Sequence, residues 1–322
     1  MNWLSRSNQW LNHRWLKRSS WFNSPYLLLV LTVLFWAGNA IVGRAVHSQI
    51  PPVSLAFWRW SLAGFLILIP AWRHLKRDWQ QILAHWQILL LLSALGIALF
   101  NTLLYQGLQF TTAINAILMQ SAMPLVVVLL SYSLFQEKLT CKQAIGVGIS
   151  FMGAVAIVAH GDWQQLVTLS FNQGDLLILI GVVGYAGYTA LLRLRPKLHP
   201  LSFLAVTFIL GSFLLLPFYL GEIATGQFTP LTSTTILSIG YVAIFPSILA
   251  YLCYNRGVEL IGANQAGLFI HLVPVFGSVM AMLFLGEKLY WFHAIGFSLI
   301  LSGITLVTRQ PDQGLGALKN AK

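Results

Sequence analysis

Two ionisable side chains stand inside long apolar runs of this sequence, where a charge is costly. Arg59 lies between Trp58 and Trp60, and His271 lies in a second run. A buried arginine in such a segment is a typical partner for an anionic group, and histidine is the side chain that exchanges a proton near neutral pH. The residue types therefore predict anion recognition at Arg59 and a coupling proton at His271.

Each of these residues also has a structural alternative. Arg59 is about six residues into its run, so it could instead extend to lipid headgroups beside two interfacial aromatic rings. His271 could simply form hydrogen bonds within a helix bundle. Asn264 and Ser278 stand seven residues to either side of it, and this spacing predicts that all three share one helical face.

Uncharged polar residues recur at helical spacing in four other apolar runs. Amide, phenol and indole groups on an apolar wall suit a small polar or zwitterionic solute, and the alternative is hydrogen bonding between helices. We expect these residues, with Arg59 and His271, to line one central cavity. They are Trp36 and Asn39, Asn101 and Tyr105, Tyr185 and Tyr188, and Tyr251 and Asn255.

The apolar runs that carry these residues read as membrane-spanning helices. Only 8% of the 322 residues are charged and 57% are hydrophobic, so the chain needs lipid as a partner. A span takes about 20 residues, and ten runs meet this length within a few residues. They fall at about 26–46, 53–72, 86–107, 112–135, 141–159, 174–194, 200–221, 232–255, 263–285 and 289–308.

Basic residues orient these ten spans. With both termini cytosolic, 16 Lys and Arg residues lie inside, against Arg44 and Lys288 outside and Arg59 within a span. The net charge of +11 is scattered and does not predict binding to nucleic acid. Residues 1–25 are predicted to be a basic amphipathic segment on the inner leaflet of the plasma membrane, or else a disordered basic tail, and residues 309–322 a second cytosolic tail.

The two halves of the chain are related in sequence. Residues 113–153 and 263–303 share eleven identities at a constant shift of 150, including Pro124 with Pro274 and Glu137 with Glu287. Each half has five spans, an odd number, so the second half must insert upside down. We therefore predict two inverted five-helix repeats, residues 26–159 and 174–308, around a central cavity, which is a recurring architecture of secondary transporters.

The order of these motifs resembles the EamA-type transporters of the drug/metabolite transporter superfamily. The resemblance rests on the run from Phe35 to Asn39, on Pro52 followed by Arg59, on Pro124 leading to Glu137-Lys138, on Gly174-Asp175, and on Pro274 leading to Glu287-Lys288. It implies ten helices, a central cavity, and the export of amino acids or related metabolites.

We expect a secondary transporter without cofactor, metal or catalytic residue. Pro124 and Pro274 are candidate gating bends, because a proline inside a span frees a backbone carbonyl. The alternative function is proton-coupled efflux of lipophilic cations, which calls for a membrane carboxylate, yet all eight acids fall at predicted span ends, loops or tails. A membrane enzyme is less expected, because the sequence contains no nucleophile–base pair and no cluster of metal ligands. The sequence does not exclude a channel.

Overall fold

The computed structural model describes residues 24–308 except 47, 112–115, 117, 118, 160, 163, 165–171, 286, 287 and 289. The predicted N-terminal amphipathic segment, apart from its last two residues, and the C-terminal tail lie outside this range. The described secondary structure is helical throughout. The elements are α1 Pro25–Val46, α2 Pro52–Ala84, α3 Trp86–Ser93, η3 Ala94–Leu99, α4 Phe100–Gly107, α6 Met123–Phe135, α7 Cys141–Val158, α9 Gln173–Leu191, η4 Leu192–Leu194, α10 Pro200–Ala224, α11 Ser233–Ala243, η5 Ile244–Leu249, α12 Ala250–Leu268, η6 Phe269–His271, α13 Leu272–Leu285 and α14 Trp291–Thr308.

Eight helical stretches in the described part of the chain are long and apolar enough to cross a membrane. One of them, Ser233–Met280, has 48 residues and bends at Gly262, whose φ of 81° is open to glycine at little cost. A shorter apolar helix covers Met119–Phe135. Helices suit these sequences because every backbone group in lipid must find its partner within the segment. The protein is therefore a multi-pass membrane protein.

The prediction that Pro124 and Pro274 interrupt helix interiors is wrong. Pro124 is the second residue of α6, and Pro274 is the third residue of α13, which follows the short 3-10 segment η6. Proline is tolerated in a first turn because its missing N–H would have no helical partner there. The two prolines thus begin new helices within their spans, and a gating role for them stays a prediction.

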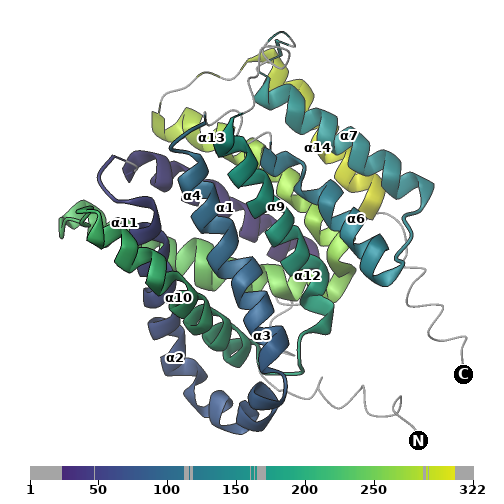
Figure 1. Cartoon of the computed structure of the whole chain (residues 1–322). Helices are drawn as coiled ribbons and strands as arrows, with labels where there is room; N and C mark the ends of the chain where they lie inside the picture. The colour runs from purple at the N-terminus through teal and green to yellow at the C-terminus, as the bar shows by residue number, and fades with distance from the viewer. Residues whose placement is uncertain are drawn as a thin grey trace, which may run out of the picture.

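Helices far apart in sequence pack side by side across the molecule. Figure 1 shows α7 beside α14 and α2 beside α10. Helix α4 packs on α9, and α12 packs on α1. Helix α6 also packs on α9, as α13 does on α1. Each contact thus has a counterpart in which the first-half and second-half partners exchange roles.

Glycines show this exchange at atomic detail on α7 and α14. A Cβ atom at Gly153 would lie 2.7 Å from the carbonyl oxygen of Gly296, and one at Gly146 would lie 2.8 Å from that of Gly303. Gly146 and Gly296 are related by the shift of 150, and so are Gly153 and Gly303. The two contacts are therefore equivalent, and only glycine lets the backbones approach so closely.

A widened π-helical turn interrupts an equivalent helix in each half. The segments η3 and η5 each have six residues, and their starting positions, 94 and 244, differ by 150. A π turn replaces the usual hydrogen bonds of the α-helix and often marks a functional site. Gly96 in η3 and Pro246 in η5 occupy equivalent positions, and their carbonyl groups accept side-chain hydrogen bonds from the opposite half.

Helix α2, which carries Arg59, is held at both ends by carboxylates. Glu222 near the end of α10 accepts hydrogen bonds from the backbone N–H groups of Val53 at 3.0 Å and Ser54 at 2.6 Å. Asp78 near the end of α2 accepts one at 2.9 Å from the N–H of His199, which caps α10. Each carboxylate satisfies donors at the partner's N-terminus, where negative charge is favourable. The two helices are thereby fixed against each other.

Candidate functional site

Arg59 lies in the protein interior between the two halves. Its side chain is 1% exposed, among the largest fully buried side chains of the described residues. The guanidinium group stacks over the Trp60 ring at 4.6 Å from the ring centroid. The alternative in which Arg59 extends to the lipid headgroups is therefore wrong, because helix α2 turns this face toward α1, α4 and η5.

Five neutral acceptors surround the guanidinium group. Nη1 donates to the side-chain oxygens of Asn39 at 3.2 Å, Asn101 at 3.1 Å and Tyr105 at 3.2 Å. Nε donates to Ser247 Oγ at 2.7 Å, and Nη2 donates to the carbonyl oxygen of Pro246 at 3.1 Å. The Asn101 and Tyr105 pair, together with Asn39, thus bonds to Arg59. Helices α1 and α4 of the first half and the π segment η5 of the second half thus converge on this one group.

No carboxylate is bonded to Arg59 among the described residues. The ion pairs in this part of the chain are Arg77 with Asp78, Arg193 with Glu137, and Arg195 and Arg256 with Glu259. A buried charge that lacks a counter-ion is expensive even when its hydrogen bonds are satisfied. The site therefore carries a positive charge that a bound anion would neutralise.

Aromatic rings fill the space between the halves beside Arg59. The Trp36 ring lies 5.6 Å from that of Tyr185, 6.3 Å from that of Tyr251 and 5.1 Å from that of Tyr254, measured between centroids. Tyr188 lies 5.4 Å from Tyr185. These separations are typical of favourable aromatic pairs. The predicted residues of spans one, six and eight thus meet in one cluster.

Some polar groups of this aromatic cluster form hydrogen bonds between helices. Others have no hydrogen-bond partner among the described residues. The Tyr251 hydroxyl donates to the carbonyl of Gly96 at 2.5 Å, and the Tyr188 hydroxyl donates to Asn255 Oδ1 at 2.8 Å. Two buried N–H groups in or next to the cluster, Asn255 Nδ2 and Trp60 Nε1, have no hydrogen-bond partner among the described residues. An unpaired buried polar group costs about 1–3 kcal/mol, so these atoms favour a solute that offers acceptors.

His271 is not bonded to Arg59 but contacts Ser121 and Ser150. Its Nε2 lies 2.9 Å from the carbonyl oxygen of Ser121, and its Nδ1 lies 2.7 Å from Ser150 Oγ. A carbonyl only accepts, so Nε2 carries the proton and Nδ1 accepts from the serine hydroxyl. Asn264, His271 and Ser278 do not lie on one continuous helix, since they belong to α12, η6 and α13 respectively. Asn264 bonds to Glu137, and Ser278 bonds to the Pro274 carbonyl.

The sequence matches a known family over both halves. The EamA-like transporter family matches residues 23–159 and again residues 172–309. The chain belongs to the EamA-like transporter family. The family and its named relatives are transporters and not enzymes.

Relatives of this EamA-like transporter cover nearly the whole chain. An uncharacterized transporter of Archaeoglobus fulgidus is 30% identical over 295 residues, which are 90% of this chain and 99% of the relative. YyaM of Bacillus subtilis, also described as an uncharacterized transporter, is 28% identical over 282 residues, 87% of this chain and 92% of the relative. A crystal structure matches with a TM-score of 0.73 over 93% of this chain and 99% of the other, at 18% identity, which shows a shared fold.

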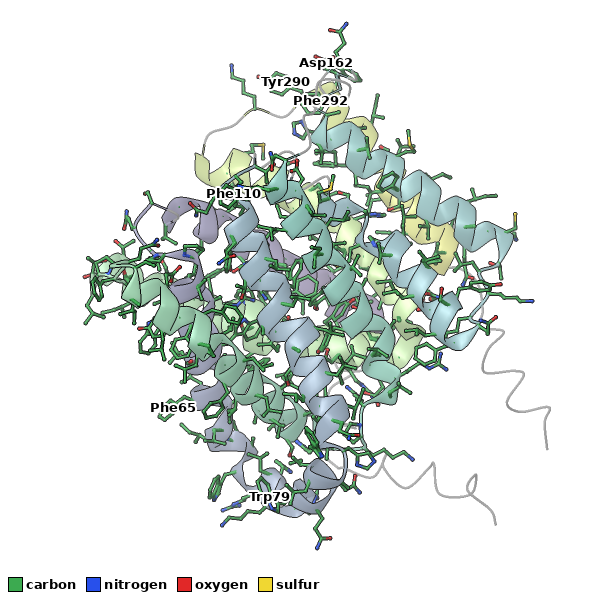
Figure 2. The ribbon with its side chains drawn as sticks, viewed as in Figure 1. Phe65, Trp79, Phe110, Asp162, Tyr290 and Phe292 are labelled. Carbon is green, nitrogen blue, oxygen red and sulfur yellow. The ribbon has the colours of Figure 1, made fainter. Side chains whose placement is uncertain are left out.

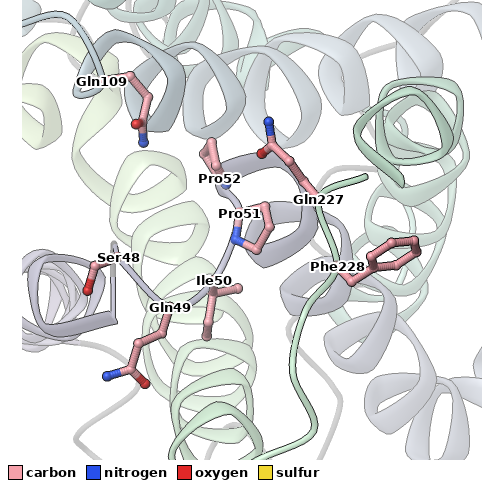
Figure 3. Close-up of a pocket in the computed structure, with 8 residues that line it drawn as sticks. All are labelled: Ser48, Gln49, Ile50, Pro51, Pro52, Gln109, Gln227 and Phe228. Carbon is pink, nitrogen blue, oxygen red and sulfur yellow. The ribbon is translucent and has the colours of Figure 1, made fainter. Parts of the chain in front are cut away.

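A hollow of about 280 Å³ in this EamA-like transporter lies away from Arg59. Figure 3 shows it between the loop that joins α1 to α2, the residues after α4, and the loop that joins α10 to α11. Its lining residues are Ser48, Gln49, Ile50, Pro51, Pro52, Gln109, Gln227 and Phe228. The topology predicted from the sequence places all three of these segments on the outer face of the membrane.

Sequence reasoning missed four contributors to the site of this EamA-like transporter: Trp60, Pro246, Ser247 and Tyr254. The position of Trp60 in the sequence indicates only an interfacial aromatic ring. Ser247 aligns with Ile97 in the first half, so the repeat gave no polar signal there. The Tyr254 hydroxyl meets that of Thr189 at 2.9 Å, and neither residue was part of the predicted pairs.

Replacement of His271 by glutamine tests the proton role in this EamA-like transporter. We expect His271→Gln to leave the transport rate and its pH profile unchanged, because both ring nitrogens are engaged in helix contacts and an amide can both donate and accept. The measurement is solute flux between about pH 5 and pH 8, where histidine changes charge. A flattened profile would instead support His271 as a proton carrier.

Proposed function

We propose that this protein is a secondary transporter that moves a small polar metabolite across the plasma membrane by alternating access between two inverted halves. The observation that carries the proposal is the Arg59 site, because a buried charge there is held by groups from both halves. Solute sites of inverted-repeat transporters lie at this interface. Amino acids and related metabolites are the solutes that the family resemblance implies, and export is the proposed direction.

The ten-span arrangement is part of this proposal. Dividing the stretch Ser233–Met280 at Gly262 and counting Met119–Phe135 as a span turns the eight long stretches into ten. The exchanged glycine contacts of α7 and α14, and the π segments at a shift of 150, support a two-fold relation of five-helix halves. Two nearly equivalent halves supply two nearly equivalent states, which alternating access requires.

We propose that both termini face the cytosol. Figure 2 supports this orientation, since Trp79 lies at one end of the molecule while Asp162, Tyr290 and Phe292 lie at the opposite end. The basic residues near Trp79 belong on the inside. A reporter fused after residue 322 is expected to read cytosolic, and one inserted at Asp162 external; an external reading after residue 322 would contradict the ten-span arrangement.

The charge at Arg59 argues against the alternative function. A lipophilic cation would be repelled by a buried guanidinium group, and no acid of the described residues bonds to this group to bind a cation and a proton in turn. The alternative would need a carboxylate at the site.

Flux into liposomes tests the proposed function. Purified protein in proteoliposomes should take up at least one member of a panel of labelled metabolites with a rate that saturates, and should exchange it against the same solute on the other side. Saturation and exchange distinguish a carrier from a channel. Flux that rises linearly with concentration for every solute would contradict alternating access.

A further inference from the structure

The guanidinium group of Arg59 divides its hydrogen bonds between the halves. Among the described residues, Nη1 bonds only to first-half side chains, those of Asn39, Asn101 and Tyr105. Nε and Nη2 bond only to the second half, to Ser247 and Pro246 of η5. Nε and Nη2 form one flat edge of the group, and such an edge matches the two oxygens of a carboxylate.

We propose that the transported solute is a net monoanion whose carboxylate binds the Nε and Nη2 edge of Arg59 in place of Ser247 and Pro246. Binding would thus release the second half from Arg59 while Nη1 keeps its three first-half partners. The inference rests on the proposed function and adds to it a substrate charge and a link between binding and movement of the halves.

The two displaced groups keep other hydrogen bonds. The Pro246 carbonyl also accepts from Trp36 Nε1 at 3.2 Å, and the Ser247 hydroxyl donates to the Val242 carbonyl at 2.8 Å. Their release from Arg59 therefore leaves neither one unpaired. The guanidinium group exchanges two bonds to neutral acceptors for a bidentate pair of bonds to an ionised carboxylate, in which donor and acceptor are both charged.

The surroundings favour a monoanion over a zwitterion. Six acids lie in the described residues, and each has partners elsewhere: Asp78, Glu137, Asp162, Asp175, Glu222 and Glu259. None of these six carboxylates is bonded to Arg59, so none is placed at this site to pair with the ammonium group of an amino acid. The unpaired N–H groups of Trp60 and Asn255 instead suit an acceptor such as a carbonyl oxygen. A 2-oxo acid therefore fits better than the amino acid with the same side chain.

A matched solute pair tests this selectivity. 4-Methyl-2-oxopentanoate and leucine share their carboxylate and carbon skeleton and differ in the carbonyl or ammonium group at C2. We expect the oxo acid to bind purified protein at least about tenfold more tightly, because the ammonium group of leucine would be buried without a carboxylate partner. Tryptophan fluorescence measures both dissociation constants. Equal or tighter binding of leucine would overturn the monoanion assignment.

Variants of the two binding partners test the displacement. Ser247→Ala removes a competitor of the carboxylate and should lower the Kd for 4-methyl-2-oxopentanoate severalfold. Arg59→Lys keeps the charge but not the flat edge, and should raise the Kd about tenfold. Ser93→Ala is the matched control, because Ser93 is equally buried and its hydroxyl bonds to the Leu89 carbonyl in α3; its Kd should not change.

The outcomes separate the inference from the function. If Ser247→Ala weakens binding as Arg59→Lys does, Ser247 supports Arg59 and the displacement is wrong. If liposomes take up leucine saturably and exclude the oxo acid, the protein is a transporter and the monoanion assignment fails. If the oxo acid binds tightly but every solute crosses without saturation, the assignment holds and alternating access fails.

Discussion

Replacing Arg59 by glutamine is expected to reduce solute transport by about tenfold to a hundredfold, the range that corresponds to losing a hydrogen bond to a charged group. The same change should leave the melting temperature unchanged or raise it. The guanidinium charge is 1% exposed and has no carboxylate bonded to it among the described residues, so its removal relieves a desolvation cost. Functional sites commonly trade stability for activity in this way.

The two readouts together distinguish the binding role from a bracing role. Uptake into proteoliposomes gives the rate, and thermal unfolding in detergent gives the melting temperature. Arg77→Gln is the control, since Arg77 is about half exposed and its ion pair with Asp78 spans 3.6 Å; exposed pairs contribute little. If Arg59→Gln lowers the melting temperature markedly and keeps the transport rate, Arg59 is a structural brace.

Replacing Gly153 by alanine is expected to destabilise the protein by several kcal/mol or to prevent its folding. The new Cβ would lie 2.7 Å from the Gly296 carbonyl oxygen and 2.9 Å from the Ile300 backbone nitrogen. Both are backbone atoms of α14, so they cannot move aside as a flexible side chain would. Overpacking of a tight contact typically costs about 1–3 kcal/mol or more, and here it would push the two helices apart.

Gly148 on the same helix provides the matched control. A Cβ at Gly148 would meet no atom within 4 Å. Alanine there should be neutral or stabilising by up to about 1 kcal/mol, because glycine is the weaker helix former. The midpoint of thermal unfolding measures both variants. Similar midpoints for Gly148→Ala and Gly153→Ala would show that α7 and α14 are not in close contact.

The π segments explain how a symmetric scaffold holds an asymmetric site. Gly96 and Pro246 are equivalent by the shift of 150, yet Gly96 accepts a hydrogen bond from the neutral Tyr251, whereas Pro246 accepts one from the charged Arg59. The first half thus supplies the charge, and the second half supplies tyrosine hydroxyls. A solute that binds Arg59 would meet both kinds of surface at once.

The membrane class, the family and most of the site residues could be predicted from the sequence. Apolar composition requires lipid as solvent, and a shift of 150 between Pro124 and Pro274 reports a duplication. Helical spacing placed Asn101 with Tyr105 on one face, and both bond to Arg59. These are local or compositional properties, so they need no knowledge of which helices touch.

Only the tertiary structure decided what Arg59 and His271 contact. An arginine near the end of a span can turn to headgroups or to protein, and the choice depends on which helices pack against that face. His271 was grouped with the central residues because spacing assumes one continuous helix, but the 3-10 segment η6 rotates the chain between Asn264 and His271. The partners Ser247 and Pro246 come from a segment nearly 190 residues away from Arg59 in the sequence. Such contacts result from packing of the two halves, which sequence periodicity within a single helix does not encode.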